Sequence, residues 1–348
     1  MASQPKNARR LKGAAPRGPG QTTVQRDTLT VELAWGLGDV LLTTSAIRRY
    51  KELHPETRIV YRTYTQNRGT RYRVIYDKGC PAEMLYGNPD IDEIKDVAGH
   101  PAAVDVKFRY AYFGGPSLDY PIQAHFWENL GLEWELGQRF DSYFYLTDEE
   151  RQWANRALPH HPILAVAPAC GWPGKEWNKD GWAELIRWAT GEGFLVAVLA
   201  GERLSGPPWD ARGVINFSSQ LDMRQNAAIL NAAVKAVLIE GGLSNLRFAL
   251  GHPAILLTCA TQVGLQIWTP PELTTEIRMR TLVEAGIVAP PRPGIIEAPA
   301  CEPCMWRLEH PKTHTVNVAP ASLAHCPDGR SLRDVPASAV IEALKGEP

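Results

Sequence analysis

The first ordered part of the chain alternates apolar and polar positions in a pattern typical of a strand, a loop and a helix. Residues 28–35 form a β-rich run that ends at Gly36, and from residue 40 to 53 the apolar positions fall on one helical face. A second β-rich run covers residues 58–65. The order predicts two parallel strands joined by a right-handed helical crossover.

The same alternation of strands and helices continues to the end of the chain. Before residue 159, strands are predicted at 91–97, 104–108 and 142–146, and helices at 121–130 and from a capping Thr147 to about Leu158. After the interruption Pro-His-His-Pro, strands are predicted at 163–167, 194–200, 234–239 and 254–258. Helices are predicted at 182–190, 223–231, 243–250 and 337–344, with one helical stretch between proline-rich loops in 270–299.

This pattern predicts an α/β protein with two domains of similar size, as expected for 348 residues. The predicted divisions are a disordered basic tail at 1–26, a first domain at 27–158, a second at 159–334, and a C-terminal helix at 335–348.

Composition and charge narrow the class of protein. With 44% hydrophobic and 22% charged residues, disordered, collagenous and coiled-coil chains are excluded. Residues 1–26 carry six Lys or Arg and no acid, so the rest has a formal charge of −7. We interpret this tail as a solvated leader without a nucleic-acid partner; attraction to an anionic membrane surface or to nucleic acid is the alternative.

The same composition bears on location. The longest uncharged run, at 248–271, is broken by Gly, His, Pro and Gln, so no membrane span is predicted. Six cysteines are too few for a disulfide scaffold, which favours a reducing, cytoplasmic location, with attachment to the inner face of the membrane as the alternative.

Three loop segments carry candidate chemistry. Gly38 and Asp39 lie where a strand gives way to a helix, and Lys175 lies on a turn-rich loop after the strand at 163–167. Gly241 and Gly242 end a buried strand and open a helix. Free backbone N–H groups at such junctions suit phosphates. Each segment also has a structural interpretation without a ligand. Asp39 would cap the helix, Lys175 would be a solvated surface side chain, and Gly241-Gly242 would form a plain turn from strand to helix.

Together these segments resemble glycosyltransferase family 9, the heptosyltransferases. Residues 38–48 are similar to the opening motif of the family, with Ser45 in place of the usual proline. Residues 86–94 resemble its Asn-Pro-x-Ile-Asp segment, and residues 168–177 resemble its Pro-Gly and Lys-x-Trp segment. The resemblance extends over about residues 28–261.

The donor signature of the family is usually Asp-Ser-Gly with a His three residues later, whereas this chain has Glu240-Gly241-Gly242 and Asn245. Glu-Gly-Gly is similar to the variant in the autotransporter heptosyltransferase branch, whose members carry a cysteine-bound metal finger. The resemblance implies a GT-B fold with two Rossmann-like domains facing a cleft. Residues 27–158 would form the acceptor side and residues 159–334 the nucleotide-sugar side, with inversion at the anomeric carbon and no catalytic metal.

Candidate roles follow from this division. Asp39 is the candidate general base, and Lys175 with the N–H groups after Gly241 and Gly242 is expected to stabilise the departing diphosphate. Four further residues are assigned to the donor site: Glu202, Glu240, Ser244 and Asn245. Glu202 and Glu240 are expected to hold ribose hydroxyls; capping of the helix is the alternative for Glu240.

The acceptor side carries a basic run interleaved with tyrosines. The run consists of Arg62, Arg68, Arg71 and Arg73, and Gly38 is a further candidate residue on the acceptor side. Guanidinium groups in the cleft would suit an anionic glycan or protein acceptor; a solvated basic loop is the alternative.

A Cys301-x-x-Cys304 pair lies near the C-terminus, with Cys326 and His314 as further candidate ligands. This donor set predicts a structural zinc or iron site; ordinary reduced thiols are the alternative.

The leading hypothesis is an inverting glycosyltransferase that moves heptose from ADP-heptose to a glycan, as in lipopolysaccharide biosynthesis, or to a protein hydroxyl. A non-catalytic nucleotide-sugar-binding or assembly protein on the same scaffold is the alternative. An epimerase or dehydrogenase ranks third, because the chain lacks a third glycine and a Tyr-x-x-x-Lys pair. The donor sugar, the acceptor and the oligomeric state, a homo-oligomer included, stay open.

Overall fold

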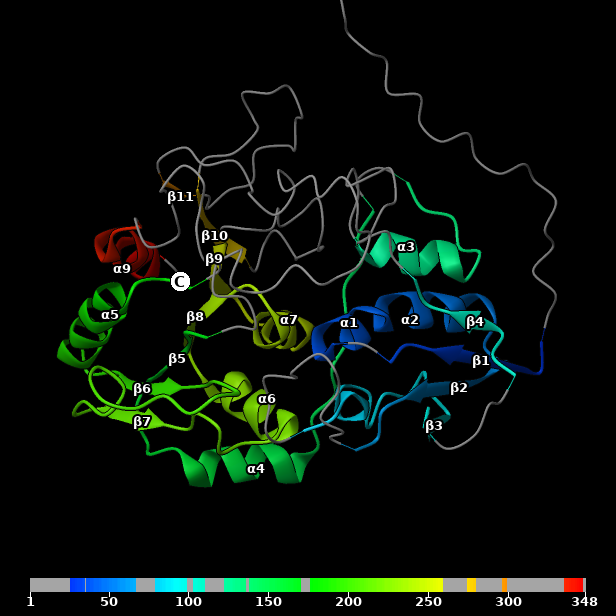
Figure 1. Cartoon of the computed structure of the whole chain (residues 1–348), viewed down its shortest axis with the longest axis horizontal. Helices are drawn as coiled ribbons and strands as arrows, with labels where there is room; N and C mark the ends of the chain where they lie inside the picture. The colour runs from blue at the N-terminus through cyan, green and yellow to red at the C-terminus, as the bar shows by residue number, and fades with distance from the viewer. Residues whose placement is uncertain are drawn as a thin grey trace, which may run out of the picture.

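The computed structural model contains two parallel β-sheets side by side, each with helices packed on it (Figure 1). It describes residues 26–34, 36–66, 79–98, 103–109, 122–135, 138–169, 176–258, 274–279, 296–298 and 335–346. The predicted α/β class is confirmed.

The first sheet has the strand order β3-β2-β1-β4. Its strands are β1 (Thr28–Glu32), β2 (Arg58–Thr63), β3 (Glu93–Asp96) and β4 (Val106–Lys107). The second sheet has the order β11-β10-β9-β8-β5-β6-β7. Its strands are β5 (Ile163–Ala167), β6 (Leu195–Val198), β7 (Val214–Asn216), β8 (Lys235–Ile239), β9 (Ala254–Thr258), β10 (Thr274–Met279) and β11 (Ile296–Ala298).

Helices connect these strands and cover the sheets. In chain order they are α1 (Leu37–Leu42), α2 (Thr44–Leu53), the 3₁₀ helix η1 (Pro81–Met84), α3 (Ile122–Asn129), α4 (Asp148–Ala157), α5 (Lys179–Gly191), α6 (Met223–Ala232), α7 (Gly242–Ala249) and α9 (Ala337–Gly346). As predicted, Thr147 caps α4: its hydroxyl accepts from Glu150 N, and the Glu150 carboxylate accepts from Thr147 N.

The single helix predicted over residues 40–53 is instead two helices that meet at Thr43. The hydroxyl groups of the two adjacent threonines explain the break. Thr43 Oγ donates to Val40 O at 2.7 Å, and Thr44 Oγ donates to Leu41 O at 2.6 Å. Such bonds compete with the regular helical pattern and bend a helix.

The strand predicted at 142–146 is wrong. Its backbone bonds lead to three different elements instead of one partner strand, because Tyr143 N donates to Thr44 Oγ, Phe144 N to Ala249 O, and Tyr145 O accepts from Arg224. The apolar alternation there reflects buried Phe144 and Leu146 in an irregular segment.

Three strands and η1 had no predicted counterpart. β10 and β11 lie in the 270–299 region that was predicted to hold one helical stretch, and β7 and η1 were missed. β10 pairs in parallel with β9, from Thr274 opposite Ala254 to Arg278 opposite Thr258. The pairing with the edge of β9 therefore determines β10, and the local sequence pattern does not reveal such a long-range pairing.

Alternate residues of the second sheet face two different layers of helices. Leu164, Val166 and Val237 pack with α5 and α9 in one apolar cluster. Ala165 and Ala236 face the other way, in a second cluster that includes α6, α7 and the apolar core of the first sheet. One hydrophobic core is therefore continuous through both sheets.

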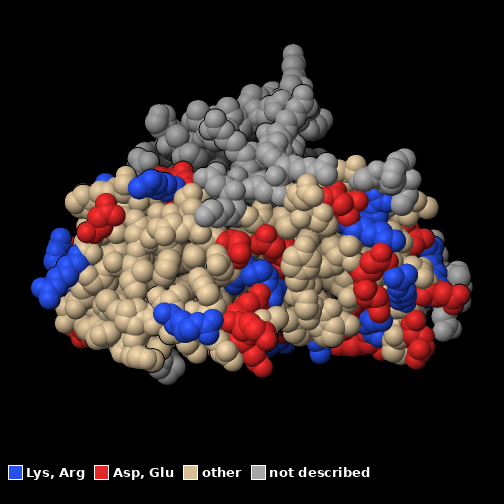
Figure 2. Space-filling model, turned by 90° about the horizontal axis from the view of Figure 1, so that it is seen from below, with Lys and Arg blue, Asp and Glu red and all other residues tan. Residues whose placement is uncertain are grey.

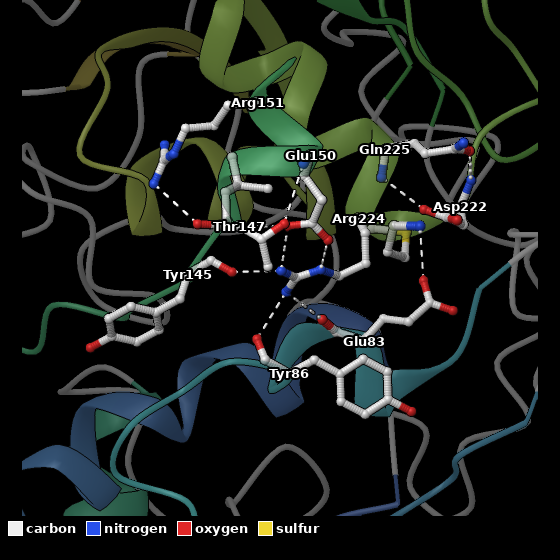
Figure 3. A network of polar contacts seen from close by, with 11 residues as sticks. Glu83, Tyr86, Tyr145, Thr147, Glu150, Arg151, Asp222, Arg224 and Gln225 are labelled. Atoms are coloured by element: carbon white, nitrogen blue, oxygen red, sulfur yellow. Dashed lines mark hydrogen bonds and ion pairs between the residues drawn. The ribbon is translucent and has the colours of Figure 1, made fainter. Parts of the chain in front are cut away.

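The sheet β1–β4 and its helices form the first unit of the chain, and the sheet β5–β11 and its helices form the second unit. Arg224 at the start of α6 joins these two units (Figure 3). All five of its N–H groups donate: to both carboxylate oxygens of Glu150 and to Tyr145 O at 2.6 Å each, to Tyr86 O at 3.0 Å and to Glu83 O at 3.3 Å. The side chain is only 11% exposed. Burial raises the pKa of Glu150, but the Arg224 and Thr147 hydrogen bonds outweigh it, so that this pKa lies below its ordinary value.

Glu83 of the first unit completes this joint from the other side. Its carboxylate accepts from Met223 N, the first residue of α6, at 3.0 Å and from Cys80 N at 2.9 Å. Gly79, with φ +110°, allows the loop to lie against Met223, because a β-carbon there would stand 3.0 Å from Met223 Cγ. The first unit thus caps a helix of the second unit.

We predict that Arg224→Ala lowers the free energy of unfolding by about 3 kcal/mol, because three carbonyl groups and the Glu150 carboxylate lose their donors. Chemical denaturation monitored by tryptophan fluorescence measures this change. Arg187→Ala, on the exposed surface of α5, is the matched control and is expected to have little effect. Equal stability of the two variants would contradict the prediction.

Candidate functional site

Two of the three predicted segments meet in space. A β-carbon built on Gly38 would stand 3.0 Å from Asn245 Nδ2 and 3.4 Å from Gly242 Cα. The helices that contain them, α1 and α7, pack side by side (Figure 1). A side chain at position 38 would displace the Asn245 amide, so glycine allows this close approach. The structure therefore brings the opening motif and the candidate donor motif to one place.

Both segments connect a strand to the helix that follows it. β1 leads to α1, whose N-cap is Gly36, and β8 leads to α7, whose N-cap is Gly241. These helix N-termini lie at the carboxyl ends of parallel strands, where ligands of open α/β sheets bind. The Ser244 hydroxyl accepts from Gly241 N at 3.0 Å and donates to Gly241 O at 2.8 Å. Ser244 therefore also holds the turn in shape.

Asp39 lies in the first turn of α1, next to the contact that Gly38 makes. It is half-buried and takes part in further polar or electrostatic interactions. Its carboxylate is turned towards the start of the helix, because a β-carbon on Gly36 would stand 3.1 Å from Asp39 Oδ2. The positive end of the helix dipole stabilises the ionised carboxylate there.

The other candidate donor residues share one edge of the second sheet. Glu240 follows β8 and is 4% exposed, and Glu202 follows β6 and is exposed. β5 lies between these two strands, and Lys175, which follows β5 in the sequence, lies outside the described residues. Glu240 N donates to Leu257 O at 3.1 Å, which ties the end of β8 to β9.

Arg62 is not on a loop. It lies on β2, is 4% exposed, and its Nε is 3.3 Å from Glu32 Oε2 on β1. Lys107 of β4 lies 3.2 Å from the other oxygen of Glu32. Arg68, Arg71 and Arg73 lie outside the described residues.

On the face of the first unit seen in Figure 2, basic and acidic side chains intermix. Ion pairs of the first unit include Arg58–Glu93, Lys95–Glu93 and Lys51–Asp92. This face therefore does not present a field of one sign.

Ser45, which replaces the usual proline of the resembled motif, has a partner that proline cannot have. Its Oγ accepts from Trp127 Nε1 of α3 at 2.7 Å, and both side chains are buried. The substitution therefore ties α2 to α3, next to the candidate site.

Two residues close to the elements of this site, Arg224 and Tyr61, have no role predicted from the sequence. The helix predicted at 223–231 already has Arg224 in its first turn, and the Asp222-x-x-Gln225 capping box is present in the structure, but neither indicates the acceptors of Arg224. No local signal distinguishes Tyr61 from an ordinary core residue of a strand.

The candidate metal ligands Cys301, Cys304, Cys326 and His314 lie outside the described residues. Among the residues that the structure describes, no group of three or more His, Cys, Asp and Glu is arranged to hold a metal ion. Within the same residues, no helix has the length and apolar character needed to cross a membrane.

We predict that Gly38→Ala destabilises the protein by about 2 kcal/mol, because the added methyl group meets the Gly242 backbone and the Asn245 amide. Thermal unfolding followed by circular dichroism measures the loss. Gly191→Ala at the end of α5 is the matched control, since nothing lies within 4 Å of a β-carbon there. A Gly38→Ala variant as stable as this control would show that the two helices are not in close contact.

No protein-family model matches the sequence, and no curated protein is significantly similar to it. Solved structures are similar in fold. A glycosyltransferase family 9 structure from Veillonella parvula has a TM-score of 0.60 at 13% identity, covering 93% of this chain and 97% of its own. The E. coli ADP-heptose lipopolysaccharide heptosyltransferase II has a TM-score of 0.56 at 13% identity, covering 92% and 98%.

The iron-containing dodecameric glycosyltransferase TibC from enterotoxigenic E. coli has a TM-score of 0.60 at 16% identity, covering 92% of this chain and 76% of its own. These likenesses extend over nearly the whole chain. They confirm the expected architecture: the chain has the GT-B fold, with two α/β units packed against each other.

Proposed function

We propose that this protein is an inverting glycosyltransferase that transfers heptose from ADP-heptose to a hydroxyl group of a glycan or a protein. The observation that carries the proposal is the contact of Gly38 with Gly242 and Asn245, which places the Asp39 turn against the glycine turn at the start of α7. TibC in complex with ADP-D-β-D-heptose supports this donor: its TM-score is 0.52 at 18% identity, covering 71% of this chain and 61% of its own.

In the proposed reaction, Asp39 is the general base. Its carboxylate takes the proton of the acceptor hydroxyl while that oxygen attacks the anomeric carbon from the face opposite the diphosphate. The new carbon–oxygen bond forms as the bond to the diphosphate breaks, and the nucleoside diphosphate leaves with the electron pair. The configuration of the sugar is thereby inverted.

The departing diphosphate needs positive charge or N–H donors. We assign this role to Lys175 and to the backbone N–H groups after Gly241 and Gly242, where the dipole of α7 adds to the effect. Glu202 and Glu240, at the ends of β6 and β8, are assigned to the ribose hydroxyls, and Asn245 to the donor. The proposed mechanism uses no catalytic metal.

The acceptor is proposed to be anionic and to bind on the first unit. Arg62 is already paired with Glu32, so the guanidinium contacts would come mainly from Arg68, Arg71 and Arg73. The acceptor would be either an anionic glycan of the lipopolysaccharide type or an anionic protein that offers a hydroxyl group. We propose a cytoplasmic location, either free or attached to the inner face of the membrane. We also propose that the protein forms a homo-oligomer, by analogy with dodecameric TibC.

The altered donor signature favours one second candidate. Glu240-Gly241-Gly242 and Asn245 differ from the usual motif, and a scaffold that binds a nucleotide sugar without transferring it would tolerate such changes. This candidate predicts binding of nucleotides without turnover.

The test is release of nucleoside diphosphate from ADP-heptose and other nucleotide sugars, with and without glycan and protein acceptors. Asp39→Asn keeps the size of the side chain but not the proton acceptor, so turnover is expected to fall by about 100-fold while ADP still raises the melting temperature. Asp180→Asn, in the first turn of α5, is the matched control. Near-normal turnover of Asp39→Asn would refute the base, and nucleotide binding without any turnover would favour the second candidate.

We further propose a structural zinc or iron ion held by Cys301, Cys304, Cys326 and His314. Thiolates and imidazole are donors that both metals take, and TibC is described as iron-containing. When bound, such an ion would stabilise the fold of the C-terminal segment and take no part in the transfer.

Elemental analysis of protein purified without an affinity metal is expected to find about one zinc or iron per chain. Cys304→Ser should lose the metal and lower the melting temperature, whereas Cys80→Ser, at the buried free thiol near Glu83, should retain it. Metal-free protein with full stability would show that these residues are ordinary thiols.

A further inference from the structure

Tyr61 is a buried phenol to which the proposed reaction assigns no role. It lies on β2, opposite Val31 of β1, and its side chain belongs to the core that also contains α1 and α2. The residue is 0% exposed, and its hydroxyl oxygen is 3.0 Å from Thr43 Oγ. A buried hydroxyl with a single described partner fixes the position of that partner.

The direction of this hydrogen bond follows from counting hydrogens. Thr43 Oγ already donates its only hydrogen to Val40 O at 2.7 Å, so it accepts from the Tyr61 O–H. Burial raises the pKa of Tyr61 well above its ordinary value, and the phenol therefore keeps its proton at physiological pH. The bond has one orientation.

Thr43 is the residue at which α1 ends and α2 begins. Its backbone N–H donates to Val40 O, and its carbonyl accepts from Ala46 N and Ile47 N at 3.0 and 3.1 Å. α1 has only six residues, and its N-cap Gly36 provides no side-chain bond. A helix this short is not stable by itself, so its position depends on such tertiary contacts.

Asp39 and Thr43 are four positions apart, which places them on the same face of the helical segment. A second observation agrees with this placement: after burial, the negative charge of Asp39 is a further cause that raises the pKa of Tyr61. The Tyr61 hydroxyl is therefore bonded to the end of the helix that carries Asp39 and interacts electrostatically with its carboxylate.

We propose that Tyr61 is a positioning residue for Asp39. Through Thr43 its hydroxyl holds α1 in place, so that the Asp39 carboxylate faces the acceptor at the contact with Gly242 and Asn245. The inference rests on the proposed transferase activity with Asp39 as its base.

Tyr61→Phe tests this inference, because it removes the hydroxyl and leaves the ring that packs near Phe108. We expect kcat to fall about tenfold through misplacement of the base, whereas KM for the nucleotide sugar stays the same because the donor groups lie on the second unit. Tyr50→Phe is the matched control: Tyr50 lies on α2 in the same core and is 4% exposed.

A double-mutant cycle shows whether Tyr61 acts through Thr43. Thr43→Val, which lacks the acceptor, is expected to lower kcat as Tyr61→Phe does, with no further loss in the double variant. Thr43→Ser retains the hydroxyl and should keep more of kcat than Thr43→Val. In the Asp39→Asn background, Tyr61→Phe should have no additional effect.

Three results would overturn the inference: kcat of Tyr61→Phe within twofold of the wild type, an equal loss in Tyr50→Phe, or additive losses with Asp39→Asn. Failure of the proposed function is recognised separately, because then the wild-type protein itself releases no nucleoside diphosphate from any donor. That outcome would overturn both proposals, whereas a wild type that turns over and an unaffected Tyr61→Phe variant would overturn only this one.

Discussion

A buried guanidinium group must find acceptors for five N–H groups, and Arg224 satisfies this requirement by drawing three segments together. The carbonyl groups of Glu83 and Tyr86 come from the first unit, that of Tyr145 from the connecting segment, and the carboxylate from Glu150 on α4. An alternative arrangement of the two sheets would leave several of these groups buried without partners, which is costly. This requirement fixes how one sheet lies against the other.

The candidate site is a result of that arrangement. Each sheet presents the carboxyl ends of its strands, and each supplies one glycine turn that opens a helix, but neither turn alone distinguishes a catalytic site from an ordinary connection. The close approach of Gly38 to Gly242 and Asn245 combines the two turns. The carboxylate of Asp39 and the N–H groups of α7 then come from different units, and the proposed transfer would use one for the acceptor and the other for the donor.

Much of the fold could be predicted because its signals are local. A few consecutive residues suffice to predict the capping box at Thr147, the apolar strands β5 and β9, and the glycine turns. The errors have long-range causes: residues 142–146 alternate because of packing at the joint, and β10 forms on an edge that β9 offers. For the site, the sequence identified the two turns. It did not reveal their contact, the acceptors of Arg224, or the bond from Tyr61 to Thr43, because these depend on residues far apart in the chain.

The continuity of the hydrophobic core through both sheets limits how such a chain can be recombined. Leu29 of the first sheet, Met223 of α6 and Leu256 of the second sheet belong to one cluster, so a cut after α4 would expose apolar surface on both fragments. Exchanging one half for that of another GT-B protein would also separate Arg224 from Glu83 and Tyr86. A functional chimera would therefore have to carry the η1 loop and the start of α6 together, although they lie in different halves of the sequence. In this protein the contacts between the two halves therefore have to be inherited together, just as the residues of one domain do.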